Sequence, residues 1–480
     1  MKKKIIISHL FLYRYRFIIG YLFLGLAFVA TIIFLPFLTT NGLAEAEMKS
    51  ATASYNLNFS SILNGDIVDL PYRILQKFSI AIFGLTIFSV KLPSILIGLL
   101  LGFLLILLLN RWFKNNVALF ASIITVFSAP FLFLAGFGTP LIMLVLWPTL
   151  LLWLGSKIQG KKHPKPIYSL IFAFVLLLSL FTPHLIYLVG FIILFAFFNP
   201  HLRFTIKKLP KIPLITTALI VISGIAFFVM NCISHPETAK NLIWTSDFSL
   251  GHFIGNINSA FAPFFTWNGS VESVFLSPLI GLGVLSLAIV GLISTTKGFF
   301  ASRNAIASCF IVFSIVLSGL NPESAILIIL PLAILTAHGL RYILEKWYTL
   351  FPENPYARIF AILPISLFLG IIIISDISHF VFGYRYTPGV ANQFNNDLSL
   401  IYENLNENDT LVVTTDTEYN FYNILNQTSD IKVTNQIPIN KPFATLGKID
   451  NAENSGNIHH IITSPKSDNS ARIYIYEAKN

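Results

Sequence analysis

The sequence predicts a polytopic α-helical membrane protein of about eleven transmembrane helices, followed by a small C-terminal extracytoplasmic α/β domain. Of its 480 residues, 55% are hydrophobic and only 11% are charged, whereas a soluble domain carries about 25% charged residues. The apolar residues gather in runs of about 18 to 22, the length that a helix needs to cross a hydrocarbon core about 30 Å thick. The composition therefore excludes a soluble globular protein.

Eleven apolar segments are the candidate spans. The first of them is longer than the apolar core of about 7 to 15 residues in a cleavable signal peptide, so we expect it to be retained as a transmembrane helix. The segments are 17–38, 92–109, 117–135, 141–155, 167–182, 184–198, 214–232, 277–294, 305–318, 324–340 and 359–379.

The charge distribution predicts the orientation. With the N-terminus in the cytoplasm, the segments assigned inside carry 20 of the 32 Lys and Arg residues, but only Glu345 and Glu353 among the 22 acids. Cytoplasmic loops are enriched in Lys and Arg. The sequence thus predicts a multi-pass protein of the plasma (cytoplasmic) membrane with its C-terminal domain outside. Because the net charge of +10 lies in short clusters between spans, it indicates topology, and no nucleic-acid partner is expected.

Two units follow from this pattern. Residues 1–379 form the transmembrane domain, with long outside loops at 39–91 and 233–276, and residues 380–480 form the extracytoplasmic domain. In the first loop, Ile74–Leu85 is too short to span and is expected to lie along the membrane interface. The tail has strand-like runs at 410–414, 431–434, 458–463 and 472–477, and helical stretches at 396–405 and 418–425.

The first outside loop carries two carboxylates, Glu45 and Glu47, soon after the first span. Acids at a membrane surface can activate an acceptor hydroxyl or amine, or hold a divalent cation beside a lipid phosphate. The alternative is a solvated acidic loop without a chemical role. The histidines form no metal-binding pattern, so the cofactor is unknown, with a divalent cation as the open alternative.

The neighbourhood of these acids resembles a known family pattern. The pieces, in order, are Gly42–Asn64, Leu70-Pro71-Tyr72, Phe83-Gly84-Leu85, Lys91-Leu92-Pro93-Ser94 and Gly138-Thr139-Pro140. Together they resemble a GT-C glycosyltransferase, the superfamily of protein O-mannosyltransferases and aminoarabinose transferases. The resemblance implies a GT-C-like fold and a reaction at the outer membrane surface.

The chain departs from this pattern at two acids. Ala44 stands where the family has its first Asp, the base that activates the acceptor, and Glu45 falls on the following Glu. Leu141 occupies the position of a second family Asp, and Phe137 that of an Arg. Either Glu45 or Glu47 replaces the base in a shifted register, or the chain has kept the fold and lost the usual catalysis.

A polyprenyl-phosphate donor would need cations at the outer surface to hold its phosphate. The candidates are Lys49, Arg73, Lys77 and His184. Interfacial Lys and Arg also anchor helices by snorkelling, which is the alternative for each of them. Trp244 and Trp267 in the second long loop are candidates for stacking on a sugar or acceptor, or else belong to the interfacial aromatic belt.

The resemblance implies an integral membrane glycosyltransferase. It would transfer a hexosyl or pentosyl group from a polyprenyl-phosphate-linked sugar to a cell-envelope glycan, lipid or protein acceptor on the extracytoplasmic face. The missing acids leave open a non-catalytic GT-C-like binding or assembly protein. A lipid flippase or transporter also stays open, although ion-coupled transport is disfavoured because the spans contain almost no interior charge.

Overall fold

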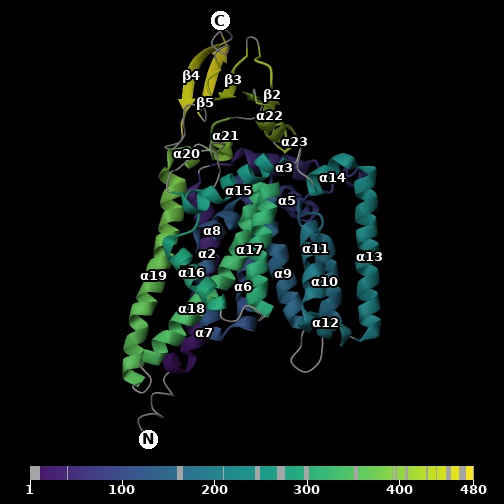
Figure 1. The fold of residues 1–480 in the computed structure, drawn as a ribbon. Helices are drawn as coiled ribbons and strands as arrows, with labels where there is room; N and C mark the ends of the chain where they lie inside the picture. The colour runs from purple at the N-terminus through teal and green to yellow at the C-terminus, as the bar shows by residue number, and fades with distance from the viewer. Residues whose placement is uncertain are drawn as a thin grey trace.

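The chain folds as a helical bundle that carries a small mixed β-sheet at one end (Figure 1). The computed structural model describes residues 11–40, 42–158, 166–208, 210–243, 249–266, 276–296, 302–350, 355–391, 393–394, 397–405, 409–413, 415–428, 431–438, 441–449, 456–463 and 472–478. The expected sugar-stacking residues Trp244 and Trp267 lie outside these ranges.

The bundle consists of long apolar helices joined by shorter ones. The first half contains α2 (Phe11–Thr39), α3 (Glu45–Tyr55), α4 (Phe59–Leu63), α5 (Leu70–Phe83), α6 (Ile87–Trp112), α7 (Asn115–Val126), α8 (Ala129–Gly136), η1 (Pro140–Ile142) and α9 (Met143–Ile158). The second half contains α10 (Pro166–Ser179), α11 (Ile186–Phe198), α12 (Pro200–Lys207), α13 (Lys211–Ser234), α14 (Pro236–Ile243), α15 (Leu250–Phe265), α16 (Leu282–Thr296), α17 (Ser302–Leu320), η2 (Pro322–Ile328), α18 (Ile329–Leu350) and α19 (Pro355–Tyr386).

The apolar composition of these helices matches a membrane protein. Within the described residues, seven helices are long and apolar enough to cross a membrane, or eight if the bent pair α7 and α8 counts as one span. Three shorter apolar helices, at 167–179, 186–198 and 282–296, lie on further predicted segments. The eleven predicted spans are thus an upper count.

Burial distinguishes the core of the bundle from its outer surface. The span Pro322–Trp347 has 72% of its apolar window buried, whereas Lys211–Ser234 has only 6%. Exposed apolar side chains on a helix of this length are stable only in a lipid environment. Figure 1 places α13 at the edge of the bundle, in agreement with a lipid-facing helix.

The predicted third span is a broken helix. Residues 117–135 fall on α7 and α8, whose axes differ by 61°. Ser128 precedes α8, and Pro130 occupies its second position. A proline has no N–H to donate to the preceding turn, so it begins a new helix more readily than it continues one.

The C-terminal domain consists of short helices and five strands. They are α20 (Pro388–Ala391), α21 (Leu398–Asn404), β1 (Thr410–Val412), α22 (Asp416–Tyr422), α23 (Leu425–Thr428), β2 (Lys432–Thr434), β3 (Phe443–Leu446), β4 (Gly456–Ile462) and β5 (Ile473–Ala478). The strand order is β2-β1-β3-β5-β4. β1 pairs in parallel with β2 and β3, whereas β5 pairs antiparallel with β3 and β4.

The C-terminal domain packs directly on the first loop of the bundle. Met48 and Ala51 of α3 share a buried apolar cluster with Phe421 and Tyr422 of α22. Polar contacts join the same surfaces, since the Tyr402 hydroxyl donates to the Leu85 carbonyl at 3.1 Å. Figure 1 shows α3 and α5 as a layer between the domain and the spanning helices. This layer frames the candidate site.

Candidate active site

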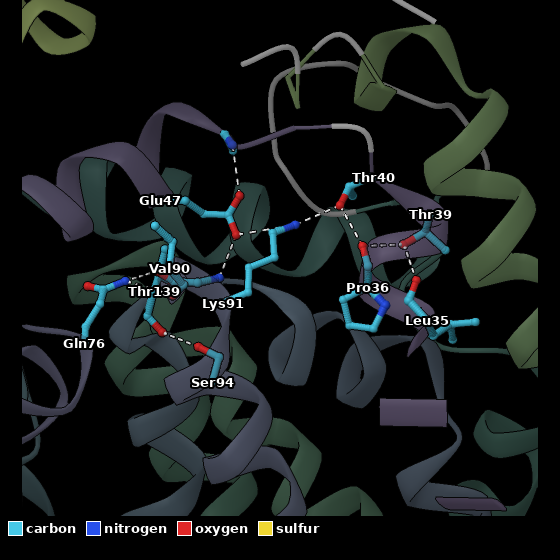
Figure 2. Close-up of polar contacts among 12 residues, drawn as sticks. Leu35, Pro36, Thr39, Thr40, Glu47, Gln76, Val90, Lys91, Ser94 and Thr139 are labelled. Atoms are coloured by element: carbon cyan, nitrogen blue, oxygen red, sulfur yellow. Dashed lines mark hydrogen bonds and ion pairs between the residues drawn. The ribbon is translucent and has the colours of Figure 1, made fainter. Parts of the chain in front are cut away.

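A buried carboxylate fixes the start of α3. Glu47 is fully buried, and its Oε2 accepts the Ala44 N–H at 2.9 Å, which satisfies a free donor at the helix N-terminus. Its Oε1 accepts the Gly138 N–H at 2.7 Å. Figure 2 shows this carboxylate joined to Lys91 of α6, whose Nζ lies 3.8 Å from Oε1 and donates to the Thr40 hydroxyl at 2.8 Å. We call these five residues the Glu47 junction.

The Glu47 junction connects α3, α6 and the loop after α8. A side chain at residue 138 would be tightly confined, because its Cβ would lie 3.1 Å from the Glu47 Oε1 and 3.0 Å from the Val90 carbonyl oxygen. Burial raises the pKa of the Glu47 carboxyl, while the charge of Lys91 and the two N–H donors oppose that rise. Both carboxylate oxygens are occupied by the protein itself.

Gln76 of α5 closes the same network. Its Oε1 accepts hydrogen bonds from Ser50 at 2.8 Å and Ser54 at 2.7 Å, and its Nε2 donates to the carbonyls of Val90 at 3.1 Å and Gly138 at 3.0 Å. A fully satisfied buried amide holds its neighbours in one geometry. The layer formed by α3 and α5 is thereby fixed to the bundle.

A cavity of about 420 Å³ lies beside this network. Its walls come from α3, α5, η1, the turn before α11 and η2. Three of the four predicted phosphate ligands, Lys49, Arg73 and His184, line it, and so do the acids Asp69 and Glu323. Segments far apart in the sequence therefore bring cations and acids to one cavity with a largely apolar wall, in the layer beneath the C-terminal domain.

The two buried cavity donors are held differently. Arg73 is 7% exposed; its Nη2 donates to Asp66 Oδ2 at 2.8 Å and to the Ala53 carbonyl at 2.6 Å. His184 is 2% exposed, and its burial lowers the pKa of the imidazole, so His184 is neutral at pH 7. It can donate or accept a hydrogen bond, but it does not supply the positive charge that the sequence suggested.

Lys49 lies at the edge of the cavity. Its side chain is 63% exposed and forms an ion pair with Glu45, with 2.7 Å between Nζ and Oε1. This contact lowers the pKa of the Glu45 carboxyl. Exposed pairs of this kind contribute about 0 to 1 kcal/mol, so Lys49 can exchange Glu45 for an anionic ligand at little cost.

Asp69 is the carboxylate that the sequence analysis did not select. It directly precedes α5 at the N-cap position, has a left-handed backbone with φ 53°, and makes no side-chain capping hydrogen bond. Burial raises the pKa of its carboxyl to about 7; Arg73 opposes the rise and the charge of Glu323 adds to it. An Asp before Leu70-Pro71 is the signal in the sequence, but that pattern normally indicates only a helix cap.

Five polar atoms of the cavity lining are buried without a hydrogen-bond partner among the described residues. They are Asp69 Oδ1, Arg73 Nε, Thr139 Oγ1, His184 Nε2 and Ser324 Oγ. A buried polar group without a partner costs about 1 to 3 kcal/mol. Five such groups around one cavity indicate a site for a polar ligand.

Two predicted site residues lie apart from the cavity lining. Glu45 is on the side of α3 toward the C-terminal domain, where the Thr417 hydroxyl approaches Oε1 at 3.5 Å. Lys77 donates to the Leu57 carbonyl and to Asn58 Oδ1 at 3.4 Å, so it anchors the loop before α4. The structure thus places Glu45 in solvent and Lys77 against the backbone, and their roles in base catalysis and phosphate binding stay predictions.

Glu47 and Glu45 differ in their ion pairs. Glu47 lies against Lys91 of Lys91-Leu92-Pro93-Ser94, whereas Glu45 lies against Lys49. Ala46, between the two acids, lines the cavity, and so do Phe137 and Leu141. At Leu141, where the resemblance implies an acid, the cavity has no carboxylate.

No set of three or more His, Cys, Asp or Glu side chains in the described ranges lies close enough together to hold an ion. Among the described lining residues, the cationic donors of the cavity are Arg73 and Lys49, and His184 and the hydroxyls are uncharged.

Comparisons with known proteins agree with this architecture. The family model described as dolichyl-phosphate-mannose-protein mannosyltransferase matches residues 72–228. The crystal structure of ArnT from Cupriavidus metallidurans bound to undecaprenyl phosphate matches with a TM-score of 0.53 and 13% identity, over 95% of this chain and 98% of that one. Its apo state matches with a TM-score of 0.51 and 13% identity, over 95% and 97%.

A search of curated protein sequences gave no significant match. At 13% identity the ArnT structures show a shared fold, and the family model adds a sequence match over residues 72–228. The chain is thus similar in sequence to this mannosyltransferase family over residues 72–228, and it shares the fold of ArnT over 95% of its length.

Proposed function

We propose that this protein transfers a sugar from a polyprenyl-phosphate donor to a cell-envelope acceptor on the extracytoplasmic face. The observation that carries the proposal is the cavity of about 420 Å³, which Lys49, Arg73 and His184 line in the layer under the C-terminal domain. The superfamily uses lipid-linked sugars, and ArnT of the same fold binds undecaprenyl phosphate.

The chemistry of the lining suits a phosphate. Arg73 is held by Asp66 and the Ala53 carbonyl, so its remaining Nε–H is a preoriented donor at the cavity. Lys49 adds a second positive charge at the edge, and neutral His184 adds an uncharged donor. Two cationic donors, each also paired with an acid of the chain, and a neutral donor can hydrogen-bond a phosphodiester and still allow the polyprenyl phosphate to leave after transfer.

The distribution of charge supports a reaction on the extracytoplasmic face. The basic clusters that mark cytoplasmic loops lie in the segments assigned inside, while α3, α5 and the C-terminal domain lie in segments assigned outside. A polyprenyl phosphate keeps its chain in lipid while its head enters a polar pocket at headgroup depth. A transfer assay with labelled donors identifies the sugar and the acceptor, whether glycan, lipid or protein.

The test uses the full chain in lipid nanodiscs. Binding of undecaprenyl phosphate and transfer from radiolabelled polyprenyl-phosphate mannose or arabinose to envelope membranes are measured for the parent and for Arg73→Met. We expect the parent to bind and transfer, and Arg73→Met to weaken binding about 10- to 100-fold, the effect of losing one charged hydrogen-bond donor. A parent that does not bind the lipid phosphate contradicts the proposal.

A second function is favoured by one specific observation. Leu141 lines the cavity where the family pattern has an acid, and Ala44 stands where that pattern has the base. A non-catalytic protein would bind the lipid phosphate with the same cations and never release the sugar. Binding by the parent without transfer to any envelope acceptor, or to water, would decide for this function. If the parent is reconstituted in lipid vesicles and moves the lipid-linked sugar across the bilayer without releasing the sugar, it is a flippase.

A further inference from the structure

We propose that Asp69 is the general base that removes the acceptor proton, in a chain that has Ala44 where the family pattern has this base. This inference rests on the proposed function and names the residue that performs its chemical step. Asp69 directly precedes α5 and lines the cavity, whereas Ala44 directly precedes α3 and is not among the lining residues. The catalytic acid would thus lie on a neighbouring element.

The Asp69 side chain does not cap α5, although Asp69 occupies the N-cap position. An Asp at an N-cap normally accepts a backbone N–H of the first turn, but Asp69 makes no such bond. Its Oδ1 is buried at the cavity without a partner among the described residues. An acceptor hydroxyl or amine in the cavity would supply the missing donor.

Backbone strain marks the same place. Among the described residues, Asp69 and His184 are the two non-glycine residues with positive φ, at 53° and 63°, and both line this cavity. Tertiary hydrogen bonds hold them there, from the Asp69 N–H to the Phe181 carbonyl at 2.7 Å and from the His184 N–H to the Leu242 carbonyl at 2.9 Å. Strain of this kind persists where the surrounding structure fixes it, and it gathers at functional sites.

The other acids near the cavity are less suited. Both oxygens of Glu47 accept backbone N–H groups. Glu323 is exposed, and it acts on Asp69 through its charge. The charged and titratable groups that face Asp69 across the cavity are Lys49, Arg73, His184 and Glu323. With a pKa of about 7, Asp69 is a base near the operating pH, which is where general-base catalysis is most efficient.

The reaction balances with this residue alone as proton acceptor. The Asp69 carboxylate takes the proton of the acceptor O–H or N–H. The freed electron pair forms the bond to the anomeric carbon of the sugar. The bond between that carbon and the phosphate oxygen breaks, and the oxygen leaves with its electron pair as polyprenyl phosphate, neutralised by Arg73 and Lys49. Asp69 then returns its proton to water.

The experiment compares Asp69→Asn with Asp416→Asn in the full chain. Asn is nearly isosteric and tolerates the left-handed backbone, and Asp416 is an exposed acid of α22 that matches the chemical change away from the cavity. Undecaprenyl phosphate binding and single-turnover transfer from polyprenyl-phosphate mannose or arabinose to envelope membranes are measured between about pH 5 and pH 9.

We expect Asp69→Asn to bind the lipid phosphate within about threefold of the parent and to transfer about 10² to 10⁴ times more slowly. The parent rate should rise with pH through about 7, and the variant should lose this rise. Asp416→Asn should behave as the parent in both assays.

The outcomes separate the two proposals. Transfer by Asp69→Asn within about threefold of the parent, or a parent rate that does not change with pH, overturns the role of Asp69 and leaves the proposed function intact. A parent that binds the lipid phosphate but never transfers overturns the catalytic proposal together with that role. Loss of lipid-phosphate binding in Asp69→Asn would identify Asp69 as part of the binding site instead of the base.

Discussion

Glu47 is a fully buried carboxylate and Asp69 a partly buried one, both in the layer under the C-terminal domain, yet their surroundings differ. Glu47 has a backbone N–H on each oxygen and Lys91 at 3.8 Å. Asp69 lines a cavity, and its buried Oδ1 has no partner among the described residues. A buried acid whose bonds are complete holds structure together, whereas one with an unused acceptor is available to a ligand. We therefore expect the Glu47 junction to stabilise the fold and the cavity beside Asp69 to bind and react with ligands.

The largest expected effect on stability is at the Glu47 junction. Glu47→Gln leaves Lys91 as an unpaired buried charge and should lower the free energy of unfolding by about 3 to 5 kcal/mol, the usual result of removing one partner of a buried pair. The double variant Glu47→Met with Lys91→Met should recover most of that loss, because neither charge is then left alone. Thermal unfolding in detergent measures both. A midpoint for Glu47→Gln equal to that of the parent would break the comparison.

The next effect concerns the cations. Lys49→Met should weaken undecaprenyl phosphate binding about tenfold, since it removes a charge at the edge of the cavity. Lys77→Met is the matched control, because Lys77 donates to the Leu57 carbonyl and lies apart from the cavity lining. Isothermal titration of both variants in nanodiscs gives the dissociation constants. Equal weakening by the two substitutions would mean that general surface charge attracts the lipid.

The pH dependence of stability sharpens the contrast further. The pKa of Asp69 is raised from 3.8 to about 7, so the folded chain keeps a proton there that the unfolded chain releases above about pH 4. The stability from this group is therefore complete below about pH 4 and is lost as pH rises through about 7. We expect the thermal midpoint to fall between pH 5 and pH 8, and Asp69→Asn to flatten that fall. An identical pH slope in both proteins would contradict the environment assigned to Asp69.

The smallest effect is expected at Glu45. Its exposed ion pair with Lys49 contributes about 0 to 1 kcal/mol, so Glu45→Gln should leave the thermal midpoint within about 1 °C and the transfer rate within about twofold. Unfolding scans and initial rates in the same nanodiscs check both values. A loss of 100-fold in rate would restore Glu45 as the base.

Hydropathy was sufficient for most of the fold. The eleven apolar runs fall on the long and short apolar helices, and four strands of the sheet lie on predicted runs. The break between α7 and α8 and the strand β3 were not predicted. The apolar content continues through the break at Ser128, and β3, with the sequence Phe-Ala-Thr-Leu, has no clear alternation of apolar and polar residues.

The candidate site was harder to predict because its chemistry depends on contacts between distant segments. Lys49, Arg73 and His184 could be selected as polar residues near the expected outer surface, and the structure brings them to one cavity. Asp69 could not, because a capping acid and a cavity acid have the same sequence pattern. Glu45 and Glu47 are two residues apart, and only their contacts distinguish the exposed acid paired with Lys49 from the buried acid paired with Lys91.

The most direct measurement is made on Asp69→Asn and Glu47→Gln side by side, with thermal unfolding and single-turnover sugar transfer recorded for the same nanodisc samples. We predict that Asp69→Asn keeps the parent midpoint or exceeds it and loses about 10² to 10⁴ in transfer rate, whereas Glu47→Gln loses stability first. The contrary result is an Asp69→Asn protein that transfers sugar at the parent rate, together with a Glu47→Gln protein that is as stable as the parent and inactive. That result would make Glu47 the catalytic carboxylate and Asp69 a structural one.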